Sequence, residues 1–204
     1  MNLNIPYMET DNKLLNDAYR IAAGDIVGNI VYYQNGLLTE EKPCMIAGLD
    51  YNTPWTRDTA INIWNALSIL SPEVSKNTLL AVLEEEEGNI YIGGQYWDSI
   101  IWMIGAREYC RFHKDDNFYR LAFKAGRNSV HRLEEDEFDE EDGLFRGPAV
   151  YGDGIAAYPD KYSKCPNQGS GILEWVDYPG NPVYPKGYGI PMKALSTNCV
   201  YFKA

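Results

Sequence analysis

Three places in the sequence set carboxylates beside aromatic side chains, a combination that suits the hydrolysis of glycosidic bonds. In that reaction one carboxylic acid protonates the leaving oxygen, while a second carboxylate activates water or attacks the sugar carbon. Tyr and Trp rings suit sugars because they offer an apolar face together with a polar edge. The three places are Trp55 to Asp58, Gln95 to Asp98, and the stretch from Asp142 to Gly154.

The first two places stand at the start of stretches with helical periodicity. At the first, Arg57 and Asp58 can pair with each other, or they can supply donors and an acceptor for neighbouring sugar hydroxyls while Trp55 stacks on a ring. At the second, Trp97 and Asp98 repeat the pairing of an aromatic residue with an aspartate. Either aspartate can instead serve only its helix, by capping the first turn or by complementing the helix dipole.

The third place is a segment rich in glycine and tyrosine around Asp153. Glycines on both sides give the backbone of Asp153 the freedom to bring its carboxyl group close to a ligand. Tyr151 and Tyr158 would partly desolvate that group, which raises its pKa towards the value that a general acid needs. An aspartate between glycines also occurs in turns for purely local reasons, and that interpretation stays open.

Other kinds of chemistry lack their sequence signals. The chain contains no P-loop, dinucleotide-binding, zinc-protease or nucleophile-elbow motif. Its two histidines, His113 and His131, have no neighbouring cysteine or third histidine, so we predict neither a metal nor a cofactor. The four cysteines form no CxxC pair and are compatible with free thiols or with two disulfides.

The charge balance disfavours partners that require a basic surface. The 204 residues include 18 Lys and Arg against 29 Asp and Glu, which gives a formal net charge of −11. We therefore expect neither nucleic acid nor an anionic membrane as a partner, and no apolar run approaches the roughly 20 residues of a spanning helix. The opening residues lack the basic and apolar regions of a secretory signal, which favours a cytoplasmic location.

Apolar residues three and four positions apart predict an all-α protein made of helical hairpins. No stretch shows the alternation expected of a β-strand. In the region 135–193 glycine, proline and scattered aromatic residues replace the periodicity, so we expect a long functional loop there. The chain is expected to be one domain, with helices at 11–34, 56–70, 74–86, 96–113 and 117–134 and a short helix from Asn198.

The string TPWTRDTAIN at residues 53–62, the DGLF sequence at 142–145 and the strandless helical pattern resemble the six-hairpin glycosidases. This superfamily of (α/α)6 barrels includes glucoamylases, the amylo-α-1,6-glucosidase part of glycogen-debranching enzymes and processing α-glucosidases. The resemblance implies an inverting hydrolase that acts on α-glucosidic or related linkages of an oligosaccharide or glycan. It implies that Asp153 is the general acid and that the substrate-binding residues are Trp55, Arg57, Asp58, Trp97, Asp98 and Tyr151.

One departure from the superfamily concerns the length of the chain. In these families the general base comes from late in the barrel, and twelve helices with their loops need on the order of 300 residues or more. The 204 residues resemble the N-terminal half. We therefore expect a fragment of a longer enzyme, an association of two copies, or a noncatalytic protein that binds carbohydrate or serves as a helical scaffold. Amphipathic helices without their partner hairpins should also expose apolar surface and favour a homo-oligomer.

Overall fold

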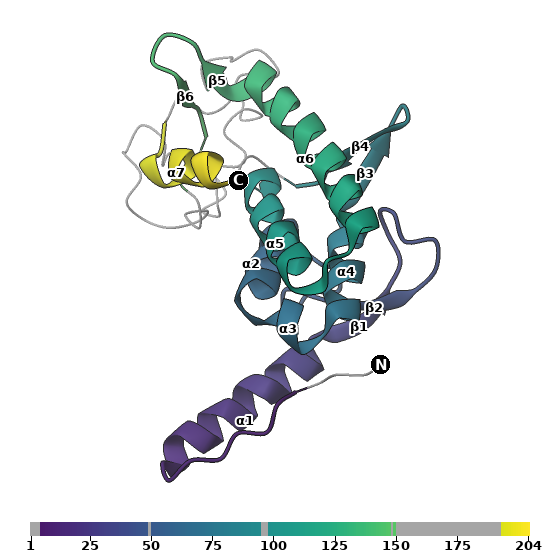
Figure 1. The fold of residues 1–204 in the computed structure, drawn as a ribbon, viewed down its shortest axis with the longest axis vertical. Helices are drawn as coiled ribbons and strands as arrows, with labels where there is room; N and C mark the ends of the chain where they lie inside the picture. The colour runs from purple at the N-terminus through teal and green to yellow at the C-terminus, as the bar shows by residue number, and fades with distance from the viewer. Residues whose placement is uncertain (1–4, 49, 95–97, 148, 150–192) are drawn as a thin grey trace.

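The computed structural model describes residues 5–48, 50–94, 98–147, 149 and 193–204, and it shows a mostly α-helical chain (Figure 1). Helix α1 (Lys13–Gly28) projects from a body in which most of the other helices gather. After α1 the described elements are β1 (Ile30–Tyr33), β2 (Lys42–Met45), α2 (Thr56–Asn62), the π-helical turn η1 (Ile63–Leu67), α3 (Ser68–Leu70), α4 (Pro72–Ala81), β3 (Leu83–Glu86), β4 (Asn89–Ile92), α5 (Asp98–His113), α6 (Asp116–Glu137), β5 (Phe138–Asp139), β6 (Leu144–Phe145) and α7 (Leu195–Lys203).

The helices of the body largely confirm the sequence periodicity. The predicted helix 56–70 is one helical segment, in which α2, η1 and α3 follow each other without a break. The predicted helices 96–113 and 117–134 correspond to α5 and α6, and α6 continues to Glu137. A side-chain cap fixes the start of α6, because Asp115 accepts a hydrogen bond from the backbone N–H of Phe118 at 3.0 Å.

The main core lies where α4, α5 and α6 meet, around the fully buried Trp102 of α5. Phe118 of α6 and Leu79 of α4 belong to the same cluster, and the indole Nε1 of Trp102 donates a hydrogen bond to the carbonyl oxygen of Leu79 at 3.3 Å. Gly105 allows α5 to approach α2 closely, since a Cβ atom there would lie 2.9 Å from the backbone of Ala60. This close packing fixes the starts of α2 and α5 relative to each other.

Three short antiparallel hairpins, β1–β2, β3–β4 and β5–β6, occur among the described residues, so the expectation of a chain without strands is wrong. The predicted helix 11–34 ends at Gly28, and the residues that follow it pair as β1 with β2. Val31, Tyr32 and Tyr33 account for the difference, because β-branched and aromatic side chains favour a pleated backbone.

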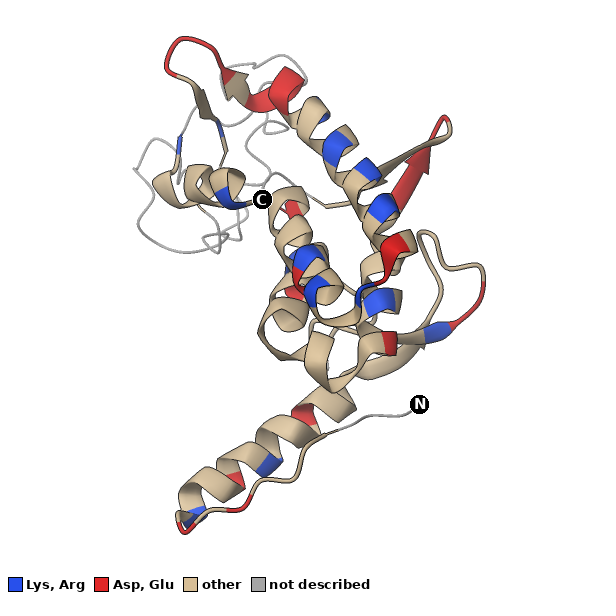
Figure 2. Cartoon of the chain, in the orientation of Figure 1, with Lys and Arg blue, Asp and Glu red and all other residues tan. Residues whose placement is uncertain are grey.

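The predicted helix 74–86 is also shorter, because the acidic residues at its end form β3. The chain turns from β3 to β4 at Glu87 and Gly88, whose φ angles of 51° and 79° suit a two-residue hairpin turn. Figure 2 shows β3 as an acidic strand close to basic residues of α6, and Arg132 forms an ion pair with Glu86 at 2.7 Å. This acidic run therefore lies on a hairpin rather than at a helix end.

Part of the region 135–193, predicted to be an irregular loop, lies among the described residues and forms the hairpin β5–β6. The Nζ atom of Lys193 lies 2.7 Å from a carboxylate oxygen of both Asp139 and Asp142. The hydrogen bond from Lys193 is the main reason why the pKa of Asp139 is lowered. The ion pair thus stabilises the charged form of Asp139.

Helix α7 packs against the β5–β6 hairpin. The rings of Phe145 and Tyr201 are stacked, with centroids 3.7 Å apart. The side-chain amide of Asn198 donates to the carbonyl oxygen of Phe145 at 3.1 Å and accepts from its N–H at 2.9 Å. The helix begins at Leu195, slightly before the predicted start at Asn198.

Helix α1 stands apart from the body, and none of its residues is buried. Its N-cap is Asn12, and the segment before it runs back along one side of the helix. There the Thr10 hydroxyl donates to the side chain of Asn16 at 2.9 Å, and the Tyr19 hydroxyl donates to the carbonyl oxygen of Pro6. Near the end of α1 Ile26 packs against the main core, whereas Leu14 and Ile21 remain exposed.

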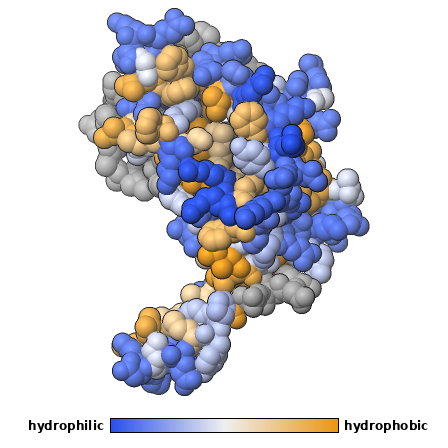
Figure 3. Space-filling view, in the orientation of Figure 1, coloured by the Kyte–Doolittle hydropathy of each residue, from blue (hydrophilic) through white to orange (hydrophobic). Residues whose placement is uncertain are grey.

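Large apolar side chains are exposed on several helices, and Figure 3 shows apolar surface where α1 joins the body. On α1 these side chains include Leu14 and Ile21, on α6 Tyr119 and Phe123, and on α7 Phe202. None of the helices within the described ranges has the length and apolar character that crossing a membrane requires.

Candidate functional site

The predicted site residues Arg57 and Asp98 meet in the fold although 41 positions separate them. The Nε atom of Arg57 donates a hydrogen bond to Oδ1 of Asp98 at 3.1 Å. The two residues are only 8% and 2% exposed. Each lies in the first turn of its helix, α2 or α5, so the ion pair ties two helix starts together.

The end of β4 and the residues after it hold this pair in place. Gly94 has a φ of +112°, and a Cβ atom there would lie 2.6 Å from Oδ2 of Asp98, so the close approach requires glycine. The hydroxyl of Thr56 donates to the carbonyl oxygen of Gly93 at 2.8 Å. The hydroxyl of Ser99 donates to the last carbonyl oxygen of β4 at 3.2 Å. This segment is therefore bound to the first turns of both helices.

Trp55 lies beside the ion pair and remains open to solvent. It is 43% exposed, and the guanidinium carbon of Arg57 lies 5.8 Å from the centroid of its ring. Tyr51 contacts the indole edge-on, with centroids 5.9 Å apart. These two neighbours hold a flat apolar surface at the protein exterior, an arrangement that suits stacking on a sugar ring.

The structure brings the predicted residues Trp55, Arg57 and Asp98 together. Asp58 is half-buried in the first turn of α2, where its charge complements the helix dipole. The predicted general acid stays a prediction, because three of the predicted residues lie outside the described part of the chain: Trp97, Tyr151 and Asp153.

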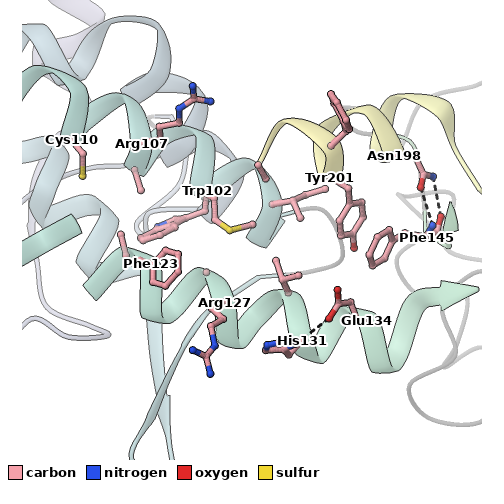
Figure 4. Close-up of a pocket in the computed structure, with 18 of the residues that line it drawn as sticks. Trp102, Arg107, Cys110, Phe123, Arg127, His131, Glu134, Phe145, Asn198 and Tyr201 are labelled. Carbon is pink, nitrogen blue, oxygen red and sulfur yellow. Dashed lines mark hydrogen bonds and ion pairs between the residues drawn. The ribbon is translucent and has the colours of Figure 1, made fainter. Parts of the chain in front are cut away.

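A groove between α5, α6 and α7 was not found by sequence reasoning (Figure 4). Its volume is about 920 Å³, and its lining is mainly apolar and aromatic. Trp102 comes from α5, Phe123 from α6, Phe145 from β6 and Tyr201 from α7. The helical spacing of Tyr119 and Phe123 is a sequence signal for this surface, but the same spacing also fits a core-facing stripe.

Burial favours the neutral forms of two titratable groups in the groove, Cys110 and Tyr201. Burial raises the pKa of the Cys110 thiol to about 11, and it also raises the pKa of the Tyr201 hydroxyl. Both groups are therefore uncharged at neutral pH. The Nδ1 atom of His131 lies 3.0 Å from a carboxylate oxygen of Glu134, so these two polar groups partner each other. The groove thus suits an apolar occupant.

Metal and thiol chemistry find little basis in the described ranges. Within them, no cluster of three or more His, Cys, Asp or Glu side chains is arranged to hold a metal ion. Cys44, Cys110 and Cys199 are free thiols, and Cys165 lies outside these ranges. Burial raises the pKa of the Cys44 thiol to about 12, so this cysteine is an unreactive core residue.

Comparison with known proteins identifies no family for this chain. No protein-family model, no curated protein and no solved structure matches it. The resemblance to six-hairpin glycosidases therefore rests on the sequence motifs alone.

Proposed function

We propose that the chain forms the glycan-binding part of a glycoside hydrolase that acts by inversion on α-glucosidic or related linkages. The observation that carries the proposal is the exposed indole of Trp55 beside the buried Arg57–Asp98 pair. Recognition of a sugar ring needs a flat apolar surface and polar groups held in fixed directions nearby. Both features occur at the starts of α2 and α5.

The arrangement of the helices supports this proposal. α5 and α6 lie side by side as a hairpin, and α2 and α4 both contact α5 (Figure 1). Consecutive helical hairpins are the building unit of an (α/α)6 toroid, which is the architecture we propose for the whole catalytic domain. The β-hairpins then lie in the connections between its helices.

In the proposed reaction Asp153 gives a proton to the leaving oxygen of the glycosidic bond. Trp55 stacks on the sugar, and Arg57 and Asp58 bind its hydroxyl groups. Asp98 is a positioning residue, because it is almost fully buried and acts through its bond to Arg57. Hydrolysis also needs a general base, and we assign that role to no residue described here. The remaining proposed substrate contacts are Trp97 and Tyr151.

A noncatalytic carbohydrate-binding protein is the second candidate. The near-complete burial of Arg57 and Asp98 favours it, since two charges that bind each other in the interior serve first to fix the helices. In that case Trp55 makes the main contact with the sugar, and Asp153 has no catalytic role.

Calorimetric titration with maltotetraose, an α-linked glucose oligomer, tests sugar binding, which both candidate functions require. The Trp55→Ala variant should bind about tenfold more weakly or worse, because the stacking surface is lost. The matched control is Tyr32→Ala, at another exposed aromatic residue, and it should bind like the wild type. A wild-type chain that does not bind the oligomer would contradict both candidates.

Hydrolysis assays on the complete hydrolase, in which this chain is the proposed glycan-binding part and the rest supplies the general base, separate the two candidates. The hydrolase should release the inverted anomer from maltose, as followed by NMR. Asp153→Asn should lower turnover of maltose by about 10²–10⁴, and turnover of an aryl α-glucoside by less, because its leaving group needs less protonation. Sugar binding without hydrolysis by the wild type would leave the noncatalytic candidate.

A further inference from the structure

Helix α1 presents an apolar stripe that the described part of its own chain does not bury. Leu14, Ala18 and Ile21 recur at helical spacing and are all exposed, and Ile21 is 65% exposed. The preceding segment contacts the helix elsewhere, at Asn16 and Tyr19. A short helix of this kind is marginal in water and is stabilised when its apolar face is packed against a partner.

The groove between α5, α6 and α7 has the form of a site for such a helix. Tyr119, Phe123 and Val130 line it from α6 at helical spacing, and Ala106 and Cys110 line it from α5. Both walls are therefore rows of side chains from neighbouring helices, which is the usual setting for a helix-in-groove contact. Figure 4 shows Trp102 and Phe123 between α5 and α6, and Tyr201 and Phe145 between α7 and α6.

The dimensions of α1 and of the groove agree. The part of α6 that lines the groove, residues 119–134, is as long as the 16-residue α1, about 24 Å at the rise of an α-helix. Arg107 and Arg127 stand on the two walls, and Asp25 continues the apolar stripe of α1 with a carboxylate of opposite charge. Electrostatic complementarity of this kind favours one partner over others.

An α1 helix that lies in the groove has to come from another molecule. In Figure 1 α1 points away from the body, at the end opposite to α7, so it does not reach the groove of its own chain. We propose that α1 of one copy lies in the groove of a second copy, whose α1 lies in the groove of the first. This arrangement is a two-fold dimer with two identical contacts.

The area of such a dimer is sufficient for stable association. A helix about 24 Å long and about 10 Å wide, half embedded in a groove, buries roughly 400 Å² on each partner. Two contacts then bury about 1,600 Å² in total, within the range of roughly 1,200–2,000 Å² that specific interfaces bury. The dimer does not depend on the proposed sugar site, because neither Trp55 nor Arg57 lines the groove.

Sedimentation velocity without sugar tests the dimer. The wild type should sediment as a dimer. Ile21→Glu in α1 or Phe123→Glu in the groove should weaken association about 100-fold or more, because each replaces an apolar contact with a charged side chain that must give up its water. Both positions are exposed within one chain, at 65% and 62%, so the variants should fold normally by circular dichroism. The matched control is Ile69→Glu on α3, which is 56% exposed and outside the groove, and it should remain dimeric.

A mixture of the two monomeric variants distinguishes this dimer from one in which two α1 helices pair with each other. The Ile21→Glu chain keeps an intact groove, and the Phe123→Glu chain keeps an intact apolar stripe on α1. An equimolar mixture should therefore form a heterodimer with one intact contact. Pairing of α1 with α1 would instead leave Phe123→Glu dimeric and would overturn the proposal. A monomeric wild type would also overturn it, and resistance of a Phe123→Cys thiol to alkylation in that monomer would indicate that another part of the same chain covers the groove.

Discussion

Helices α1 and α5 have the same length of 16 residues and opposite environments. Nine residues of α5 are buried, whereas none of α1 is. The difference follows from the distribution of apolar residues. In α5 the run from Ile100 to Ile104 is apolar on all sides, while α1 keeps Lys13, Asp17 and Arg20 on one face. Helix α5 therefore packs in the interior on all sides, whereas α1 offers one apolar face to a partner.

This comparison separates two contributions to the behaviour of the protein. The burial of α5 supports the stability of the body, because its side chains contact α2, α4 and α6. The exposed stripe of α1 supports association with a partner. Changes in α5 should therefore shift the unfolding of the whole body, while changes in the exposed stripe of α1 should act on that helix and on the proposed dimer.

The largest effect expected is that of Trp102→Ala in α5. The indole is fully buried and donates a hydrogen bond to Leu79, so the substitution leaves a cavity and removes this hydrogen bond. The free energy of unfolding in urea, followed by circular dichroism, should fall by about 3–5 kcal/mol. The same substitution at the exposed Trp55 should cost less than about 1 kcal/mol. An equal loss of unfolding free energy at the two positions would show that burial in α5 does not govern the stability of the body.

The sequence predicted the helices well because their signals are local. The spacing of Ala60, Ile63 and Leu67 was enough to place the helical segment 56–70. The strands were missed for two different reasons. Val31 to Tyr33 continue the apolar pattern of α1, and Leu83–Glu86 has the composition of a helix end, yet both pair with strands that lie further along the chain. Pairing partners are not visible in a single local pattern.

The candidate site was predictable in its residues but not in its contacts. The motifs singled out Arg57 and Asp98 separately, and only the packing of α2 against α5 shows that the two side chains form a buried pair. This packing depends on the absence of a side chain at Gly105, and none of the sequence motifs predicts the close approach of the two helices there. The groove was missed for the same reason, since it exists only where α5, α6 and α7 lie together.

Two glycine substitutions, one in α5 and one in α1, should change the free energy of unfolding by an intermediate amount and in opposite directions. Gly105→Ala in α5 should lower the free energy of unfolding by about 1–3 kcal/mol, because the new Cβ atom would lie 2.9 Å from the backbone of Ala60. Gly24→Ala in α1 meets nothing within 4 Å and should stabilise that helix by about 0.5–1 kcal/mol. Helicity at 222 nm and urea unfolding measure the two. A stabilising Gly105→Ala would show that α2 and α5 are not tightly packed.

Helix caps extend the comparison to smaller effects. The side chain of Asn12, the cap of α1, accepts hydrogen bonds from its own helix start, at Leu14 and Leu15. The cap of α6, Asp115, also accepts a hydrogen bond of 2.6 Å from Lys76 of α4. That bond is the main reason why the pKa of Asp115 is lowered, and the N–H of Phe118 contributes further. The cap in the body is thus coupled to a second helix.

The smallest effect expected is that of Asp115→Asn, and it should depend on pH. The pKa of Asp115 is lower in the folded state than in the unfolded state, so the unfolded chain binds a proton first as the pH falls. The charged carboxylate therefore stabilises the fold fully above the unfolded pKa of about 3.9. This stabilisation is lost as the pH falls through the folded pKa. Asparagine keeps the cap but loses the ion pair, so the variant should be less stable than the wild type by under about 1 kcal/mol at pH 7. This difference should vanish as the pH is lowered from about 5 towards 2.

The control variant Asp115→Ala also loses the cap. It should remain less stable than the wild type even at pH 2, because a protonated aspartate still accepts the hydrogen bond from Phe118. An Asn variant whose deficit stays constant from pH 7 to pH 2 would show that Lys76 does not couple α4 to the start of α6.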